Sequence, residues 1–587
     1  MAVRIFIELR SHEISSFQSS RCFPGFLAFK AAATTYYVDV NSADPTPPYN
    51  SWSTAATNIQ DAVDLAMNGD LVLVTNGVYQ STGGLAPDSV QTCVICTNAV
   101  TIQSINGSAA TVINGSGLMR CVYLGNGVVF SGFTVTDGNA TNIYPYSTCG
   151  GVCCETNALV ENCLIINNSA YYAGGLYFGT ASNCVISGNV SIGSGGGAEQ
   201  STLINCTVSG NSTGYIDDLN AVGVGGGVMY CYLTNCVLTG NSSPDEGGGA
   251  LSSTLNNCTL NNNSSWVGAG AANCSLNNCL VFSNSASTQY FGYSALTAGG
   301  GVAYGSANNC IILGNVVQLD ERSSQAEAFG GGAYETALNN CTVVDNGVAG
   351  GYGGGAYGGS AYNSIIYYNG ATYQVSLVGA GNVTNVTLNY SCTFPTPTSG
   401  SGYFNFTNVP LFVSISGTGG NLHLQSNSPC INAGNNAYAV GATDLDGNPR
   451  IAGGTVDIGV YEYQTPKSAI SYAYLQQYGL PTDGSVDFKD LDGSPYNVYQ
   501  DWIAGLNPTN VASVLTMLSP PPNNNASGVM VSWESVSGIN YNLLRAAGAT
   551  SAFTTVQSNI VGQAGTTSYT DATATNGGPY FYRVAVP

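Results

Sequence analysis

The stretch Gly197-Ala-Glu-Gln-Ser-Thr-Leu-Ile-Asn-Cys206-Thr-Val-Ser-Gly-Asn211 is one copy of a phrase that recurs nine times between residues 150 and 370. Each copy has an Asn before a central Cys, another Asn five residues after it and, in every copy but the first, Gly nine residues before it. Such recurrence is typical of a solenoid, in which each copy forms one coil. The central residues are Cys163, Cys184, Cys206, Cys236, Cys258, Cys279, Cys310, Cys341 and, in the ninth copy, Ser364.

The length and composition of the repeat predict an all-β solenoid. Helical repeats of 21 to 31 residues would carry Ala, Leu, Glu and Lys rather than Gly, Asn and Thr. In the quoted copy Cys206 and Val208 have the period-two spacing of one strand face, and Leu203 joins them in the core. Stacked coils lie about 4.8 Å apart, so the asparagines can form ladders of side-chain amides. We therefore expect a right-handed parallel β-helix, with the handedness taken from the general preference of crossovers.

Composition excludes some partners and constrains the cysteines. Only 7% of the residues are charged and the net charge is −21. Between residues 31 and 420 Arg120 and Arg322 are the only cations, so a nucleic acid would find no basic track. The eight central cysteines are predicted to be buried free thiols, because a stacked column disfavours disulfide geometry. Apart from the N-terminal segment, no stretch approaches the length of a membrane span.

The N-terminal part of the chain is divided into two regions. Residues 1–33 have basic residues, weak apolar patches and a run of alanines, which indicate a secretory signal segment and a secreted or cell-surface protein. Residues 34–420 are expected to form the β-helix with an N-terminal cap, in which a short amphipathic helix near residues 58–66 covers the open apolar end. This helix-then-strand opening resembles that of bacterial proteins of the pectin lyase-like β-helix superfamily, and the resemblance covers about residues 36–465.

Residues 421–465 resemble the segment that closes β-helices in many bacterial surface proteins, often called a choice-of-anchor domain. Three phrases carry this resemblance: Ser428 to Gly434, Asp444 to Arg450 and Val456 to Tyr463. Asp444, Asp446 and Arg450 within it are expected to form either a calcium cluster or a turn held by an ion pair.

Residues 466–511 are expected to be a linker that contains a degenerate calcium loop, similar to those of dockerin and thrombospondin type 3 repeats. Pro495 stands where these loops have Gly, so the pattern is incomplete. Residues 512–587 resemble a small fibronectin type III-like β-sandwich. The residues predicted to bind calcium, the one cofactor expected, are Asp490, Asp492, Ser494 and Asp501.

Three coils carry insertions of eight to ten residues, all between the closing Asn and the next glycines. The insertions therefore share one corner of the coil, where protruding acids and aromatics can form a sugar-binding or catalytic groove. The alternative is that these loops only add solubilising charge. Substrate-binding candidates are Tyr215, Tyr290, Phe291, Tyr293, Asp320 and Glu321. Catalytic candidates are Asp217, Asp218, Asp245 and Glu246.

The sequence favours a secreted or cell-surface scaffold that binds polysaccharide or a cell-surface glycan and mediates attachment. The alternative is a polysaccharide-degrading enzyme at the insertion corner. A glycosidase would pair one protonated and one ionised carboxylate. A lyase is less favoured, because its chemistry needs a cationic base and the coils hold only two cations. The β-helix fold itself hosts lyases, hydrolases, adhesins and inert scaffolds, so it cannot decide between these functions.

Overall fold

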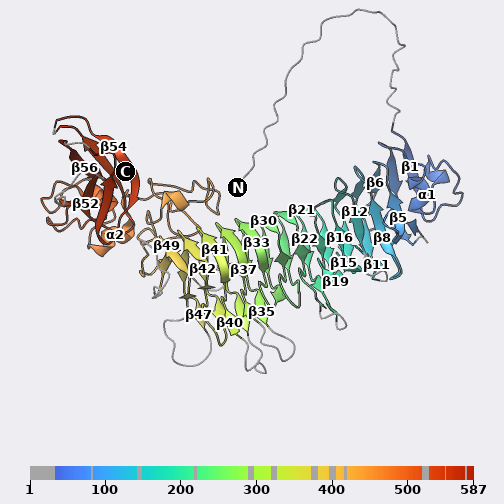
Figure 1. The fold of residues 1–587 in the computed structure, drawn as a ribbon. Helices are drawn as coiled ribbons and strands as arrows, with labels where there is room; N and C mark the ends of the chain where they lie inside the picture. The colour runs from blue at the N-terminus through green and yellow to red at the C-terminus, as the bar shows by residue number, and fades with distance from the viewer. Residues whose placement is uncertain are drawn as a thin grey trace, which may run out of the picture.

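The chain forms a long rod of stacked strands that is followed by a smaller unit at its C-terminal end (Figure 1). This computed structural model describes residues 33–587 apart from several gaps. The gaps are residues 81–82, 142–147, 217–220, 288–295, 319–326, 372–380, 396–404, 416–419, 519–527, 549 and 576–577.

The rod is a parallel β-helix, as predicted. One coil consists of β20 (Ala198–Glu199), β21 (Thr202–Ile204), β22 (Thr207–Ser209) and β23 (Ser212–Thr213). The first two strands belong to a 24-stranded sheet, sheet A, and β22 belongs to a 13-stranded sheet, sheet B. The fourth strand belongs to sheet C, which has segments of four and five strands among the described residues. Neighbouring coils pair in parallel and in register, so that like positions of successive repeats stack.

Sheet B shows the regularity of the stacking. Its strands are β3 (Gly77–Tyr79), β7 (Thr111–Asn114), β10 (Thr134–Thr136), β14 (Leu164–Ile166), β18 (Val185–Ser187), β22, β28 (Val237–Thr239), β31 (Thr259–Asn261), β34 (Leu280–Phe282), β38 (Ile311–Leu313), β42 (Thr342–Val344), β46 (Ile365–Tyr367) and β50 (Cys392–Thr393). From β10 to β46 each strand places its central residue in the apolar core, where the alignment gives one column of Val, Ile and Leu side chains.

The asparagines that follow the central cysteines form a buried ladder of side-chain amides. Asn211 donates both its backbone N–H and its Nδ2–H to Oδ1 of Asn241, each at 3.0 Å. Asn241 in turn donates from Nδ2 to Val208 O at 2.9 Å and to Oδ1 of Asn263 at 3.0 Å. The predicted ladder is therefore confirmed, and it links each coil to the next through the turn. Its members are Asn168, Asn189, Asn211, Asn241, Asn263, Asn284, Asn315, Asn346 and Asn369.

The repeated glycine is explained by this ladder. A Cβ added at Gly197 would lie 2.9 Å from Nδ2 of Asn211 and 2.6 Å from Gly227 O. Real Cβ atoms do not approach backbone this closely, so any side chain here would push the coils apart or break the amide ladder. The Gly nine residues before each Cys and the Asn five residues after it are thus two halves of one contact.

The asparagine before each central cysteine has a different role. Asn205 and Asn235 have positive φ angles of 52° and 54°, in the left-handed region that Asn tolerates better than most residues. Their side chains form only a looser outer ladder, with 3.2 Å from Nδ2 of Asn235 to Oδ1 of Asn205. These residues therefore form the turn between sheets A and B.

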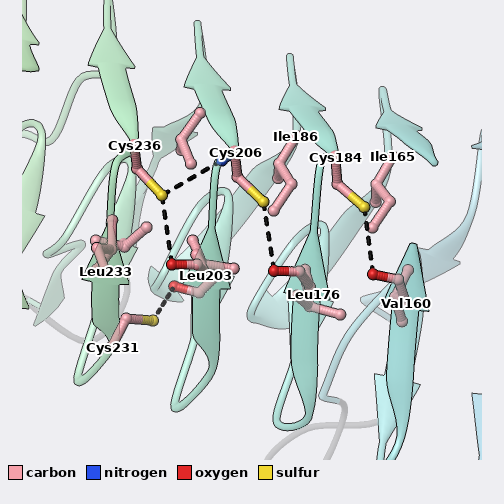
Figure 2. Packing of buried hydrophobic residues seen from close by; sticks show 14 of the residues in the cluster. Val160, Ile165, Leu176, Cys184, Ile186, Leu203, Cys206, Cys231, Leu233 and Cys236 are labelled. Carbon is pink, nitrogen blue, oxygen red and sulfur yellow. Dashed lines mark hydrogen bonds between the residues drawn. The ribbon is translucent and has the colours of Figure 1, made fainter. Parts of the chain in front are cut away.

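The central cysteines stack in one column inside the rod. Figure 2 shows Cys184, Cys206 and Cys236 on successive coils beside the apolar core. The backbone N–H of Cys206 points to Sγ of Cys236 at 3.4 Å, and that thiol donates to Leu203 O at 3.4 Å. All 18 cysteines that the structure describes are buried and free. Burial also raises the pKa of Cys231, in a second column, to about 12, so this thiol stays protonated at neutral pH.

A short helix covers the N-terminal end of the core. Helix α1 (Ile59–Val63) is capped by Asn58, whose side chain accepts a hydrogen bond from the backbone N–H of Asp61. Ile59, Ala62 and Val63 are buried and join the apolar cluster of the first coils.

The segment 421–465 packs against the side of the rod, over the last coils of sheet B. Arg450 donates from Nη1 to Asn309 Oδ1 at 2.8 Å, and Val460 N–H donates to Thr342 Oγ1 at 3.1 Å. Outward residues of sheet B are mostly apolar where the segment covers them, whereas earlier coils mix Thr and Ser with apolar residues such as Leu164 and Ile166. The shared apolar cluster includes Ile311, Leu313, Val344, Ile365, Leu422, Leu424, Ile431, Ile458 and Val460.

Residues after 465 form two further apolar clusters, one around two short helices and one between two small sheets. Helices α2 (Tyr472–Gln477) and α3 (Val498–Ala504) lie within the predicted linker and share an apolar cluster. The last region has two antiparallel three-stranded sheets around Trp533 and Tyr541. They are β51 (Met517–Leu518), β52 (Val529–Ser535) and β55 (Gly565–Asp571), and β54 (Thr554–Val561), β53 (Asn540–Ala546) and β56 (Phe581–Ala585). Among the described residues no helix has the length and hydrophobicity to cross a membrane.

We predict that Asn241→Ala destabilises the β-helix by about 3 kcal/mol, because the backbone N–H and Nδ2 of Asn211 would lose their buried acceptor. Asn261→Ala, on the outward face of the same region, should cost less than about 1 kcal/mol. Urea unfolding followed by far-UV circular dichroism measures both. Equal losses in the two variants would show that the ladder is not the main coil-to-coil contact.

We also predict that at least the eight central cysteines are reduced in the purified protein, because each is buried and its thiol donates a hydrogen bond to a main-chain carbonyl. Thiol titration after denaturation without reductant should count at least eight free groups. A count near zero would mean that the column is cross-linked and the coil geometry described above is wrong.

Candidate functional site

Most of the residues predicted at the insertion corner lie outside the described part of the chain. These are Asp217, Asp218, Tyr290, Phe291, Tyr293, Asp320 and Glu321. Tyr215 lies in β24 (Tyr215–Ile216), which pairs antiparallel with β25 (Ala221–Val222) next to the first insertion. The described residues that border the insertions, such as those of β24 and β25, lie in the chain between the amide ladder and the following glycines.

Asp245 and Glu246 are described, and both are half-buried at this corner. The Asp245 carbonyl accepts hydrogen bonds from the backbone N–H groups of Trp266 and Val267, at 2.9 and 3.0 Å. The Glu246 carboxylate accepts from Nδ2 of Asn273 at 3.3 Å, so it points along the rod to the next coil. Burial raises the pKa of Asp245, and burial together with the Asp245 charge raises that of Glu246.

Next to these acids lies an aromatic patch, which we define as Tyr304, Phe329, Tyr334, Tyr352 and Tyr357. Ring centroids are 5.4 Å apart for Tyr304 and Tyr334, 5.8 Å for Tyr334 and Tyr357, and 4.4 Å for Phe329 and Tyr357. Phe329 and Tyr352 are nearly parallel, 6.2 Å apart, and Tyr352 is 51% exposed. The rings are therefore a contiguous and partly exposed aromatic surface.

Strand stacking brings these rings together from three successive coils. Tyr304 lies in β37 (Val302–Asn308), Tyr334 in β41 (Ala333–Asn339) and Tyr357 in β44 (Ala356–Tyr357). Tyr334 and Tyr357 pair in register, and Phe329, at the end of β40 (Glu327–Phe329), forms a parallel bridge with Tyr352. Figure 1 shows β40 beside β35 (Ser285–Ser287) and β47 (Gly370–Ala371) along one edge of the rod.

Sequence reasoning missed this patch, although a signal was present. An Ala-Tyr pair follows the glycines in three copies, at Ala303-Tyr304, Ala333-Tyr334 and Ala356-Tyr357. These tyrosines belong to the repeat itself and not to the insertions.

The aromatic patch is bordered by carboxylates. Glu335 is exposed and follows Tyr334 directly, and a side chain at Gly358 would clash with its carboxylate. Burial raises the pKa of Tyr304, and the charges of Glu246 and Glu335 raise it further. The charges of Glu246 and Glu335 thus both reach the Tyr304 side chain.

Cations are scarce around the described coils. Arg120 is fully buried, and its guanidinium donates to Asp88 at 2.6 and 3.1 Å and to main-chain oxygens. Arg322 lies outside the described residues. The described surface of the coils therefore presents no cationic base to a ligand at the patch.

The predicted calcium loop is partly assembled. Oδ1 of Asp490 accepts the backbone N–H groups of Asp492 and Gly493, and Oδ1 of Asp492 accepts that of Ser494. Oδ2 of Asp492 and Oδ1 of Asp501 are buried without a hydrogen-bond partner, and the Asp501 residue as a whole is only 2% exposed. Burial first, and then the nearby charges of Asp492 and Asp490, raise the Asp501 pKa to about 6.

Two orphaned carboxylate oxygens are what a bound cation would satisfy. Within the described residues, however, no three His, Cys, Asp or Glu side chains group closely enough to hold a metal. A calcium ion would therefore depend on Asp492 and Asp501 together with neutral oxygens such as Ser494 Oγ.

The second acidic turn, at Asp444 and Asp446, has its oxygens occupied. Oδ1 of Asp444 accepts the N–H groups of Asp446 and Asn448, while Asp446 lies 2.6 Å from Nε2 of His423. The Arg450 guanidinium lies 3.6 Å from Glu462. The expected turn is present and is held by hydrogen bonds to Asp444, but the expected ion pair within it is not the one observed: Arg450 pairs with Glu462, and Asp446 pairs with His423.

No family model matches the chain, and no curated protein matches it. Among solved structures, it is similar to the pectate lyase Pel9A, with 15% identity, coverage of 74% of this chain and 97% of that chain, and a TM-score of 0.31. It is also similar to XylC with xylose, with 9% identity, coverage of 73% and 98%, and a TM-score of 0.34. A third is the PL6 family polysaccharide lyase Pedsa3628 from Pseudopedobacter saltans, with 12% identity, coverage of 59% and 84%, and a TM-score of 0.26. Values this low carry no argument about activity, and the parallel β-helix rests on the strand pairing of this chain.

Proposed function

We propose that the protein is a secreted or cell-surface scaffold that binds polysaccharide on the aromatic patch at the insertion corner. The observation that carries the proposal is the contiguous surface of five rings, supplied by successive coils and partly open to solvent. Sugar rings have apolar C–H faces that pack on aromatic side chains, whose polar tips and neighbours then bond the hydroxyl groups.

The surroundings of the patch suit a sugar ligand. Glu335 and Glu246 provide charged acceptors for hydroxyl groups, and charge-assisted hydrogen bonds are stronger than neutral ones. Nδ2 of Asn385 donates to the Tyr357 hydroxyl at 3.3 Å, which orients that ring at the border of the patch. Because the rings belong to a stacked sheet, they are held in place before a ligand arrives, and less conformational entropy is lost on binding.

The alternative function, a glycosidase, is supported by one observation. The pKa of Glu246 is raised, which is the direction that a general acid needs. Asp245 precedes it directly in the chain, whereas the two carboxylates of a glycosidase flank the scissile bond from opposite sides. A second carboxylate for this chemistry would therefore have to come from another coil. Binding requires no such second group, so we favour it.

We predict that the double variant Tyr334→Ala/Tyr357→Ala lowers the affinity for a bound polysaccharide at least tenfold, because two stacked rings are removed from the centre of the patch. Affinity electrophoresis over a panel of plant, algal and bacterial polysaccharides identifies the ligand and measures the loss. The matched control is Tyr232→Ala, an exposed tyrosine in β27 (Tyr232–Thr234) outside the patch. If both proteins bind like the parent, the patch is not the binding surface, and release of reducing ends by the parent would favour the enzyme instead.

We also propose that calcium binds beside Asp492 and Asp501 and stabilises the region of α2 and α3. Without a cation, the raised pKa of Asp501 means that the folded state holds this proton more tightly than the unfolded state, where the pKa is about 4. The stability of the region should therefore fall as the pH rises from about 4 to about 6, and calcium at pH 7 should restore it.

Thermal melts of the full chain with calcium or with chelator test this proposal. We expect calcium to raise the melting temperature of the C-terminal region by several degrees in the parent and to leave it unchanged in Asp501→Asn. Asp483→Asn, at an exposed residue outside the loop, should respond like the parent. A parent protein whose melting temperature is the same with calcium and with chelator would contradict the proposed site.

A further inference from the structure

We propose that the aromatic patch selects polysaccharides whose sugars carry no carboxylate and rejects polyuronates. The inference rests on the proposed glycan-binding function and specifies its ligand. Its basis is charge: acids border the patch, and the described coils place no cation near it.

The two acids flank Tyr304 from two sides along the rod. Glu246 reaches Asn273, and Tyr304 occupies the same position as Asn273 one coil later, because Ala272 pairs with Ala303 in register. Glu335 occupies this position in the following coil. A glycan chain that covers Tyr304 and Tyr334 would therefore lie between the two carboxylates.

The raised pKa of Tyr304 agrees with this geometry, since the charges of both acids contribute to it. An anionic sugar placed on the same ring would meet the same negative field. The overall charge of −21 adds a long-range repulsion that weakens encounters with polyanions at low salt.

Recognition of a uronate needs a positive group, and neither source of one is found in the described coils. Arg120 is fully buried and bonded to Asp88. The second source is a calcium ion that bridges protein and ligand carboxylates; it would need a cluster of acidic ligands, and the described residues around the patch contain none. An uncharged sugar avoids both requirements, because its hydroxyl groups can donate hydrogen bonds to Glu246 and Glu335.

The test uses the full chain and two sets of soluble glycans, measured by isothermal titration calorimetry. The uncharged set contains xylan, β-glucan, α-glucan and mannan, and the acidic set contains polygalacturonate and alginate. We expect an uncharged glycan to bind at least tenfold more tightly than either polyuronate in 20 mM salt, with or without calcium. Its affinity should change little in 500 mM salt.

The double variant Glu246→Gln/Glu335→Gln tests the assigned residues. The ratio of the affinity for the uncharged glycan to the affinity for a polyuronate should fall at least threefold in this variant, because it removes the repulsion while keeping hydrogen-bonding side chains. Glu161→Gln, in β13 (Leu159–Glu161) away from the patch, should leave the discrimination unchanged. An unchanged discrimination in the double variant would overturn the role of these two acids.

The outcomes separate the two proposals. A parent protein that binds a polyuronate as tightly as any uncharged glycan, or that binds one only with calcium, would overturn this inference and leave the glycan-binding function standing. Absence of binding to every glycan in both sets would overturn both.

Discussion

The buried ladder of asparagine side chains is the interaction on which the rest of this molecule depends. The oxygen of each amide accepts hydrogen bonds from the backbone N–H and the side-chain N–H of the preceding ladder residue. Its own N–H groups donate to a main-chain carbonyl and to the next amide. A missing rung would leave several buried polar groups unsatisfied at once. The ladder also demands glycine opposite it, since a Cβ at Gly197 or Gly227 would enter the amide or the next backbone. Together these contacts hold successive coils in register.

That register explains where function can be added. Between a ladder residue and the following glycines the chain forms only a short strand of sheet C, so extra residues after that strand leave the stacking of sheets A and B undisturbed. The aromatic patch borders this corner, but most of it belongs to the repeat. Tyr334 and Tyr357 occupy a column that holds Ala272 and Ala303 in earlier coils. A repeating scaffold can therefore acquire a surface by changing one outward column, because a substitution there leaves the core and the ladder intact.

The same logic applies to sheet B. Its outward residues change from Ser187 and Thr239 to Leu313 and Val344 along the rod, and the segment 421–465 lies where they are apolar. Burial of those side chains removes an exposed apolar surface that would otherwise favour association. The C-terminal region differs in that Asp501 is buried without a partner for Oδ1. This atom and Oδ2 of Asp492 are the observations behind the proposed calcium site.

The sequence by itself determined the class of fold, the amide ladder and the buried thiols. These features depend on spacing within one repeat, and any solenoid with this period must stack like residues on like. The sequence also located the insertions, since the distance from Gly to Cys is constant across the copies. The resemblances of residues 421–465 and 512–587 to known modules remain predictions.

Tertiary structure decided the rest, because it depends on neighbours that are far apart in the chain. The rings of Tyr304, Tyr334 and Tyr357 are 30 and 23 residues apart, and only parallel pairing of successive coils makes them one surface. Only packing shows that Asp501 is buried, since its position in a degenerate loop is equally compatible with an exposed turn. Spacing within a repeat is local information and can be read from the sequence, whereas a surface is made by the contacts between repeats.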